Sequence, residues 1–473
     1  MMSGEKLIRT IESSIYIQAV MRNNMNLLAF PHDIVSKLLT DWLPLNAVGR
    51  LDSAFYNVGD RTQFLNMISS EEFVAKQTLI VPDMPNYLSW HIKRKVKTTY
   101  VLLNKDCSLT RSCLLFATIV GRHTECIELR ETKNALAVLM AGLAGGYANL
   151  QRLRLVQCGN ITGLESLLQN VGLTLREISI DACTIDTDDS FKELSLPKLH
   201  SLKLANVHNC SVLVSILDRS PQLEELVLQA AQSPDNFLQQ VSQHAHNLRR
   251  LTLWNCPYIT DTAIANLARH CPALKDLKLG GTSLTDQAVI AFTENCLELE
   301  SITLSGSFTD ASLTVIATKC GAQLRCLSIT GFGGAPGLNE LIHNCPNLRS
   351  WSVTHLPSAL PDVLVRLISS MPGLTEVALQ YCTLSDDVLN AVASLGTQLL
   401  HLDITGSQGF TSAGLANVAL RCTNLKTLYH AHYDYHAQRE LSKGMCALWG
   451  RLNPELCFNA PNWTTPPYGK WKW

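Results

Sequence analysis

The sequence predicts an α/β solenoid shaped as a horseshoe, in which parallel strands line a concave sheet and helices cover the convex side. Two observations predict it: a leucine pattern that recurs at a fixed spacing, and a helical pattern between its copies. The composition agrees, because 46% of the 473 residues are hydrophobic and 17% are charged. A chain of this length exceeds one ordinary compact core, so repeats or several domains are expected.

The recurring pattern is L-x-x-L-x-L, and a decayed copy begins at Leu425 and a weaker one at Thr124. Together these make about thirteen units, a periodicity typical of stacked structural repeats. The eleven clear copies start 24 to 26 residues apart, at Leu150, Leu175, Leu199, Leu223, Leu248, Leu274, Leu299, Leu324, Leu348, Leu374 and Leu399.

One unit shows how each repeat is expected to fold. Leu251 and Leu253 lie two residues apart on a predicted strand, so both face inward while their neighbours face outward. The following segment, TDTAIANLARHC, has helical periodicity, and Thr260 or Asp261 can cap its first turn. One strand and one helix cannot bury both inner surfaces, so the units are expected to stack.

These repeats resemble the leucine-rich-repeat family over roughly residues 120–430. The segments WNCPYITDTAIANLARHCPAL and LGGTSLTDQAVIAFTENCLEL are similar to its cysteine-containing subclass. Cysteines recur at two slots of the repeat and no C-x-x-C pair occurs, so buried structural thiols are expected rather than catalytic or metal-binding ones. The slots hold Cys158, Cys183, Cys256 and Cys382, and Cys271, Cys296, Cys345 and Cys422.

The charge balance and the absence of long apolar segments limit the classes of partner and the cellular location that we expect. Lys and Arg number 39 against 40 Asp and Glu, so no nucleic-acid or membrane partner is expected. The N-terminus lacks the pattern of a secretory signal, and no eighteen consecutive residues are apolar. The sixteen cysteines are then read as reduced thiols, and the expected location is the cytoplasm, with the nucleus as an alternative.

Two stretches raise the question of an enzyme. GFGGAPG at 331–337 lies between a predicted strand and helix, but Pro336 stands where a dinucleotide fingerprint needs a glycine, so a repeat turn is favoured. His430, His432 and His436 could bind a metal, but a solvated histidine-rich and tyrosine-rich cap is favoured. No catalytic residue, metal or cofactor is expected.

The outward-facing strand positions form the predicted binding surface. Its early rows carry mixed charges, and its later rows, from Ser301 to Thr354, carry short hydroxyl side chains that leave room for a ligand. Repeat folds bind partners through this face, although simple solvation of an exposed sheet is the alternative. The residues expected to bind a protein substrate are Arg152, Arg154, Arg250, Trp254, Lys278, His355 and Tyr381.

Residues 30–55, FPHDIVSKLLTDWLPLNAVGRLDSAF, predict two or three short amphipathic helices that need a packing partner. The segment resembles the F-box family, which is commonly followed by leucine-rich repeats. The alternative is an N-terminal cap of the repeat array. The residues that match the motif or support its docking face are Pro31, Ile34, Leu38, Leu43, Pro44, Leu45, Val48 and Leu51.

The F-box resemblance implies a Skp-family adaptor and a cullin complex as partners, with the repeats selecting an unidentified protein substrate for ubiquitin ligation. A leucine-rich-repeat scaffold or inhibitor that acts without a ligase is the alternative. The expected organisation is an N-terminal extension at 1–28, an all-helical F-box-like module at 29–65, a connecting region with irregular first repeats at 66–120, the solenoid at 121–430 and a C-terminal cap or tail at 431–473.

Overall fold

The structure, a computed structural model, divides into two compact units, Met1–Gln222 (unit 1) and Leu223–Trp473 (unit 2). The sequence predicts one array over 121–430, so the division inside it is a feature of the three-dimensional contacts. The structure describes residues 58–69, 73–75, 79–81, 93–103, 123–132, 149–161, 164–185, 194–207, 217, 219–230, 235–244, 246–281, 283–356, 360–429 and 457–458.

Within the described residues, unit 1 contains a parallel sheet and the helices α5 (Val58–Ser69) and α9 (Leu164–Val171). A separate parallel pair joins β1 (Val74–Ala75) to β3 (Lys97–Thr98). The sheet therefore begins before residue 121, within the region where the sequence predicts irregular first repeats. Its strands, in sheet order, are β2 (Leu79–Val81), β4 (Tyr100–Leu103), β5 (Cys126–Arg130), β6 (Arg152–Ile161), β7 (Glu177–Ile185) and β8 (Ser201–Ala205).

Unit 2 is the more regular array, and all its strands are parallel and follow one another in sheet order. They are β9 (Glu225–Gln229), β10 (Arg250–Trp254), β11 (Asp276–Gly280), β12 (Ser301–Ser305), β13 (Cys326–Thr330), β14 (Ser350–Thr354), β15 (Glu376–Gln380), β16 (His401–Asp403), β17 (Thr427–Tyr429) and β18 (Cys457–Phe458).

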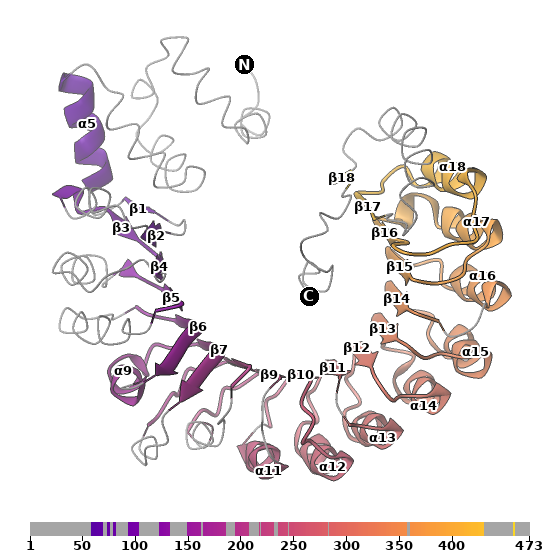
Figure 1. Cartoon of the computed structure of the whole chain (residues 1–473), viewed down its shortest axis with the longest axis horizontal. Helices are drawn as coiled ribbons and strands as arrows, with labels where there is room; N and C mark the ends of the chain where they lie inside the picture. Colours follow the sequence, from indigo (N-terminus) through magenta and orange to yellow (C-terminus); the bar gives the residue numbers. More distant parts are fainter. Residues whose placement is uncertain are drawn as a thin grey trace. The chain divides into compact units, whose positions relative to one another are not determined.

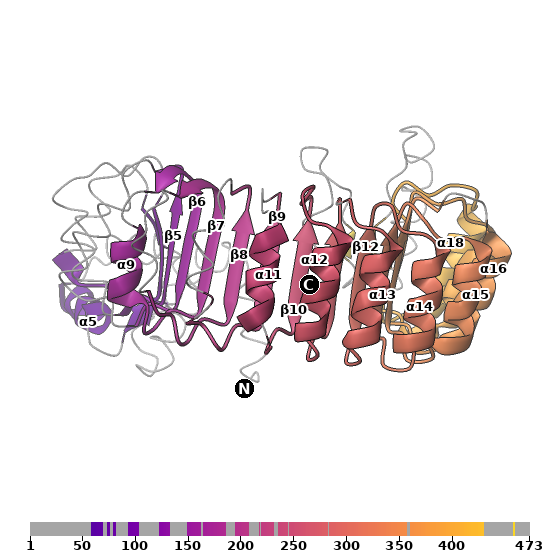
Figure 2. The same ribbon diagram turned by 90° about the horizontal axis from the view of Figure 1, so that it is seen from below.

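The helices of unit 2 lie on the outer side of its arc and the strands on the inner side, as Figure 1 shows. Seen from below in Figure 2, α12, α13 and α14 stand side by side in the same orientation. The helices are α11 (Asp235–His244), α12 (Asp261–His270), α13 (Asp286–Asn295), α14 (Asp310–Cys320), α15 (Ala335–Asn344), α16 (Pro361–Ser370), α17 (Asp386–Ser394) and α18 (Ser412–Arg421), with a 3-10 turn η6 (Gly396–Gln398). The predicted leucine-rich-repeat fold class is thus confirmed.

The core of unit 2 consists of the leucine positions of successive strands, stacked in register. Leu251 of β10 pairs with Leu277 of β11, which pairs with Ile302 of β12, and all three are fully buried. Arg250 and Trp254 face away from this core, toward the concave side. The alternation that the sequence predicts for this strand is therefore confirmed.

The helices from α12 to α18 begin either at a side chain that caps the first turn or with a proline in that turn. The Thr260 hydroxyl accepts a hydrogen bond from the backbone N–H of Ala263, which confirms the predicted cap of α12. The segment 331–337 forms the turn after β13 and the start of α15. Gly334 directly precedes the helix, and the N–H of Gly334 donates to Asp310. This glycine-rich stretch therefore has a structural place in the repeat.

The cysteines of the two repeated slots are all buried thiols that form no disulfide. The Sγ of Cys296, at the end of α13, donates to the backbone oxygen of Cys271 at 3.2 Å. Sulfur thus satisfies a backbone acceptor at the point where one repeat stacks on the next.

A residue with left-handed backbone geometry follows most strands of unit 2. Asn255 (φ 53°), Gly281 (φ 60°), His355 (φ 57°) and Tyr381 (φ 53°) occupy this position in their repeats. The N–H of Asn255 donates to the oxygen of Gly280 in the next strand, at 2.7 Å. Outside glycine this geometry costs roughly 1–2 kcal/mol, so the tight turn is maintained by the stacking of the repeats.

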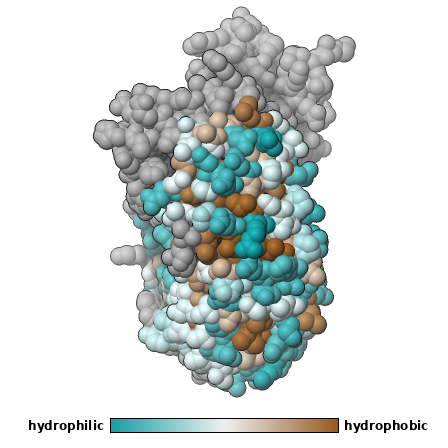
Figure 3. Space-filling model, turned by 90° about the vertical axis from the view of Figure 1, so that its right-hand side faces the viewer, coloured by the Kyte–Doolittle hydropathy of each residue, from teal (hydrophilic) through white to brown (hydrophobic). Residues whose placement is uncertain are grey.

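The right-hand side of the molecule, drawn as a space-filling surface in Figure 3, carries hydrophobic residues in separate patches among hydrophilic ones. In the part of the chain that the structure describes, no helix has the length and apolar character needed to cross a membrane.

Candidate protein-binding surface

The concave face of unit 2 contains a hollow of about 450 Å³, which we call the concave hollow. It extends from β9 to β15, and the repeats of β9, β10, β12, β13, β14 and β15 contribute lining residues. Its lining residues are Gln229, Trp254, Thr303, Ser305, Ser328, Thr330, Ser350, Trp351, Ser352, Thr354, Glu376, Val377, Ala378, Gln380 and Tyr381.

The floor of the concave hollow is formed by short hydroxyl side chains on β12, β13 and β14. Strand register places Thr303 beside Ser328, and Ser328 beside Ser352. Among the residues that the structure describes, no protein group bonds to the side-chain hydroxyls of these three residues or of Ser305 and Thr330. Because a hydroxyl both donates and accepts, this floor can bond to a peptide backbone.

Trp254, at the end of β10, lies at one end of the concave hollow. Its ring rests on Gly280 of the next strand, since a Cβ atom added at Gly280 would lie 2.5 Å from Trp254 Cζ3. Only glycine leaves room for the ring in this place. The half-buried indole is therefore held against the sheet, as suits an anchor in a protein interface.

Tyr381 lies at the other end of the concave hollow, directly after β15. Its ring stacks on that of His355, with ring centroids 4.6 Å apart and planes 14° from parallel. The ring also lies against Gly406, where an added Cβ atom would lie 2.2 Å from Tyr381 Cδ1. His355 itself is exposed and does not line the concave hollow, so its ring supports Tyr381 from the side.

A hydrogen-bonded network borders the concave hollow on the side of β15. The Ser350 hydroxyl donates to Glu376 at 2.9 Å, and Gln380 Nε2 donates to Asp403 at 2.5 Å. Burial raises the pKa of Asp403, although bonds from Thr405 and Gln380 act in the opposite direction. Gln380 is thereby oriented, and Glu376 remains as the charged side chain of the lining.

Two of the basic residues predicted to bind substrate lie on the concave face but outside the lining. Arg250 forms an ion pair with Glu225 of β9, with Nε and Oε1 at 3.6 Å. Lys278 of β11 pairs in register with Thr303 of the floor. Both therefore border the concave hollow on the side of Trp254.

Arg152 and Arg154 lie on β6 of unit 1, among charged groups that pair with one another. Arg154 Nη2 donates to Glu177 Oε1 at 3.1 Å, and Lys203 Nζ lies 3.9 Å from the same oxygen. Nearby, Glu128 is only 3% exposed and accepts from Tyr100 and Arg130. The mixed-charge zone predicted from the early rows is thus largely paired internally.

Burial acts to raise the pKa of Glu128, but the hydrogen bonds from Tyr100 and Arg130 outweigh it and the pKa lies below its ordinary value. Burial also raises the pKa of Tyr100, with Glu128 adding to the effect. Glu128 is therefore ionised at neutral pH and Tyr100 is neutral. This ionisation state suits a structural cluster better than a proton-transfer site.

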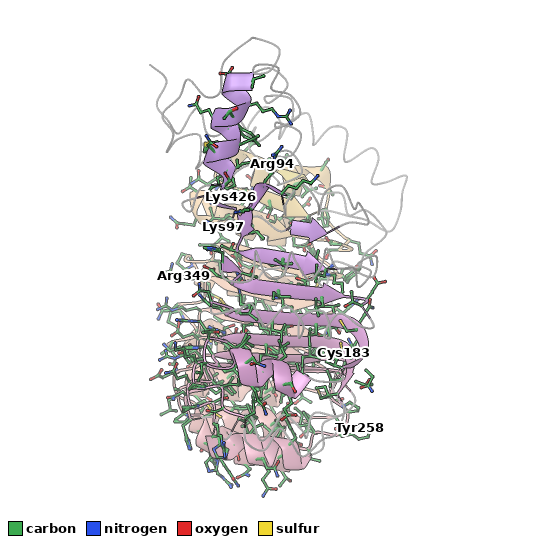
Figure 4. The ribbon with its side chains drawn as sticks, turned by 90° about the vertical axis from the view of Figure 1, so that its left-hand side faces the viewer. Arg94, Lys97, Cys183, Tyr258, Arg349 and Lys426 are labelled. Carbon is green, nitrogen blue, oxygen red and sulfur yellow. The ribbon has the colours of Figure 1, made fainter. Side chains whose placement is uncertain are left out.

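A second hollow, the edge hollow, has a volume of about 500 Å³ at the edge where strands of unit 2 begin. Arg349 and Lys426 lie at this edge in Figure 4, whereas Tyr258 lies at the opposite one. Lys275 Nζ and Glu300 Oε1 are 2.9 Å apart, and Arg325 also pairs with Glu300. The edge hollow is lined by Lys275, Leu297, Glu298, Glu300, Ala322, Gln323, Arg325, Asn347 and Arg349.

Of the residues that form or support the concave hollow, the sequence predicts Trp254 and Tyr381 but not Glu376, Gln380 or Gly280. Glu376 occupies the first outward position of its strand, the same position as Arg250, so the repeat pattern could have identified it. The role of Gly280 had no signal in the sequence, because it depends on where the ring of Trp254 packs.

Residues 30–55, with every predicted adaptor-binding residue, lie outside the described residues, as do His430, His432 and His436. In the parts of the chain that are described, no three His, Cys, Asp or Glu side chains gather in a way that could hold a metal ion.

Comparison with known proteins relates the repeats to a family. Residues 147–258 match the family described as "FBD-associated F-box protein At5g56370, LRR repeats". The chain is 22% identical over 351 residues to Antagonist of mitotic exit network protein 1 of Candida glabrata. The aligned residues cover 72% of this chain and 61% of that protein. It is 29% identical over 128 residues to F-box/LRR-repeat protein 4 of Bos taurus, covering 26% and 20%.

Among solved structures, a chain of the yeast Rad7 and Elc1 complex matches with a TM-score of 0.46 and 18% identity, over 87% of this chain and 95% of that one. The chain spans less than two thirds of the length of the curated relatives described above.

Proposed function

We propose, given that the repeats of this chain are related to those of F-box/LRR proteins, that it is the substrate-recognition subunit of an SCF-type ubiquitin ligase. Residues 30–55 bind a Skp-family adaptor, and the adaptor links the chain to a cullin complex. The concave face holds a protein substrate. The chain itself carries out no catalysis and acts in the cytoplasm or the nucleus.

The observation that supports this proposal is the concave hollow of unit 2. It combines the hydroxyl floor with two aromatic side chains, Trp254 and Tyr381, that rest on glycines of the neighbouring repeats. Aromatic anchors held in place before binding are typical of protein interfaces, because little side-chain entropy is lost on association. A substrate held here would have a raised effective concentration near the ubiquitin-loaded enzyme.

The first test is co-purification of the full chain with a Skp-family adaptor. The wild type is expected to retain the adaptor, and a variant with Leu43→Asp and Leu45→Asp is expected to lose it, because two buried carboxylates would be placed in an apolar interface. Leu173 and Leu420 are exposed leucines of the described part, so Leu173→Asp with Leu420→Asp is the matched control. The control is expected to retain the adaptor.

Each variant is first checked for cooperative unfolding by circular dichroism. If the folded wild type fails to bind the adaptor, or if the folded Leu43/Leu45 variant binds as well as the control, residues 30–55 are not a docking module. The ligase proposal is then abandoned.

The second candidate is a leucine-rich-repeat scaffold or inhibitor that acts without a ligase. It is favoured by the relative that covers 72% of this chain, whose name describes an antagonist and not an F-box protein. In that case residues 30–55 cap the array. Retention of a cullin together with the adaptor distinguishes the two candidates, because only the ligase subunit requires it.

A further inference from the structure

The charge in the lining of the concave hollow is negative. Glu376 is the charged residue of its lining, which contains no Lys, Arg or His. The Glu376 carboxylate accepts one hydrogen bond, from the Ser350 hydroxyl at 2.9 Å, and no described Lys, Arg or His lies within ion-pair distance of it. Glu376 is thus a partly exposed carboxylate with no cation beside it.

The neighbours of Glu376 on the sheet do not supply that cation. Register places Ser350 on one side of it and His401 on the other, and His401 Nδ1 already bonds to the Thr427 hydroxyl at 2.7 Å. The basic residues that border the concave hollow are distant: Lys278 on β11 lies four strands away and Arg250 on β10 lies five, which is about 19 Å and about 24 Å along the sheet. A carboxylate in this setting has an unmet preference for a cationic donor.

The dimensions of the concave hollow suit an extended peptide. Trp254 on β10 and Tyr381 after β15 are five strands apart, about 24 Å along the sheet, the length of about seven extended residues. The hydroxyls of Thr303, Ser328 and Ser352 lie between these ends and can bond to backbone N–H and C=O groups.

We infer that the concave hollow binds an extended segment of a partner protein that presents an arginine or lysine side chain to Glu376. The inference deepens the proposed function, since it states the chemistry of the substrate, but it requires only the concave face and not the adaptor. The backbone of the segment bonds to the hydroxyl floor, and Trp254 and Tyr381 bound it at its two ends.

Phosphorylated or acidic segments do not fit the concave hollow, because such ligands are bound by clusters of arginine and lysine. The lining of the concave hollow contains no arginine or lysine, since Arg250 and Lys278 only border it and Lys275, Arg325 and Arg349 line the edge hollow.

The test is selection of a phage-displayed random heptapeptide library on the purified full chain. Basic residues are expected to be enriched at one position of the selected peptides. Glu376→Gln keeps the size of the side chain and an oxygen for Ser350 but removes the charge, so the enrichment is expected to disappear. Glu376→Arg is expected to enrich acidic residues at the same position.

Affinity is then measured by fluorescence polarisation with a selected peptide, synthesised and labelled. Glu376→Gln is expected to weaken its binding about tenfold, the effect of losing one charge-assisted hydrogen bond. Glu294 is an exposed carboxylate on α13, on the opposite side of the sheet, so Glu294→Gln is the matched control and is expected to bind as the wild type does.

Several results would overturn the inference. They are enrichment of acidic residues by the wild type, the absence of any enriched basic position, or equal affinities of Glu376→Gln and Glu294→Gln. Tighter binding of a synthetic peptide of residues 459–473 than of any selected peptide would assign the concave hollow to the chain's own tail and also reject a partner. If the chain does not bind the adaptor but still enriches basic residues at one peptide position, the ligase proposal is rejected and the inference of a peptide site is retained.

Discussion

Asp286 accepts two hydrogen bonds from Thr309 of the following repeat, one from the backbone N–H at 2.9 Å and one from the hydroxyl at 2.6 Å. Asp286 begins α13, and Thr309 is the cap of α14. Asp386 holds Thr411 in the same way, with both distances at 2.7 Å. Thr285 caps the helix that Asp286 begins, and Ser385 does the same for Asp386. The hydroxyl residue therefore caps its own helix, and the aspartate after it holds the cap of a following one.

Replacement of Asp286 by alanine is expected to lower the free energy of unfolding by about 1–2 kcal/mol, because charge-assisted bonds to the next repeat are lost. Urea unfolding at pH 7 measures the change. Asp387 is an exposed aspartate in the first turn of α17 with no such bond to a neighbouring repeat, so Asp387→Ala is the control with a smaller effect. Equal losses in the two variants would contradict a special role for Asp286.

The contribution of Asp286 is also expected to depend on pH. Partial burial acts to raise the pKa of Asp286, but hydrogen bonds from Ser312 and Thr309 outweigh it, and the pKa lies below the ordinary 3.8. A lowered pKa in the folded state adds stability above the unfolded pKa, and this is lost as the pH falls through the folded value. The difference between wild type and Asp286→Ala should therefore shrink from pH 7 to pH 3, whereas a constant difference would refute the assignment.

Gly280→Ala is expected to displace the ring of Trp254, because the new Cβ atom would lie 2.5 Å from Cζ3. Acrylamide quenching of tryptophan fluorescence should rise, and the rise should vanish in a Trp254→Phe background. The control is Gly373→Ala, where the nearest atom to an added Cβ is Leu348 O at 3.9 Å. Unchanged quenching in the folded Gly280→Ala chain would show that the ring does not rest on Gly280.

Replacement of Trp351 by phenylalanine is expected to lower the free energy of unfolding by less than the loss of side-chain volume alone would predict. The side chain is fully buried on β14, and its Nε1 has no hydrogen-bond partner in the structure described. Trp351→Ala should cost about 3–5 kcal/mol in unfolding free energy because it leaves a cavity. Trp351→Phe should cost about 1–2 kcal/mol, since it also removes an unsatisfied donor. Urea unfolding measures both losses. Similar losses for Trp351→Ala and Trp351→Phe would mean that Nε1 has a hydrogen-bond partner in solution.

The cysteines at the helix ends are expected to resist alkylation in the folded chain. Burial raises the pKa of Cys271, Cys296 and Cys345 to about 12 each, from an ordinary value of 9.0. Mass spectrometry after iodoacetamide treatment at pH 8 should find Cys326, which is only partly buried, labelled before them. Labelling of Cys296 ahead of Cys326 would contradict the burial described.

These raised thiol pKa values also predict that the folded state becomes less stable as the pH rises. The folded state keeps its protons to higher pH than the unfolded state, so the stability that the thiols contribute is present below pH 9 and is lost as the pH rises toward 12.

The sequence by itself determined the repeat, the inward and outward faces of its strands, the helix caps and the slots of the buried cysteines. These features depend on side-chain spacing within one unit, where the periods of strand and helix decide which residues face the core. Leu251 and Thr260 therefore lie where the sequence predicts them.

Only the tertiary structure decided which outward residues of distant repeats share one site. Strand register and stacking bring Trp254, Glu376 and Tyr381 to the same hollow, while Arg250 is paired with Glu225 and His355 supports Tyr381. The division of the chain at Gln222 is also a result of contacts between repeats. The physical reason is that the period of one unit carries no information about neighbours across the sheet, which is set by how many units stack and in what register.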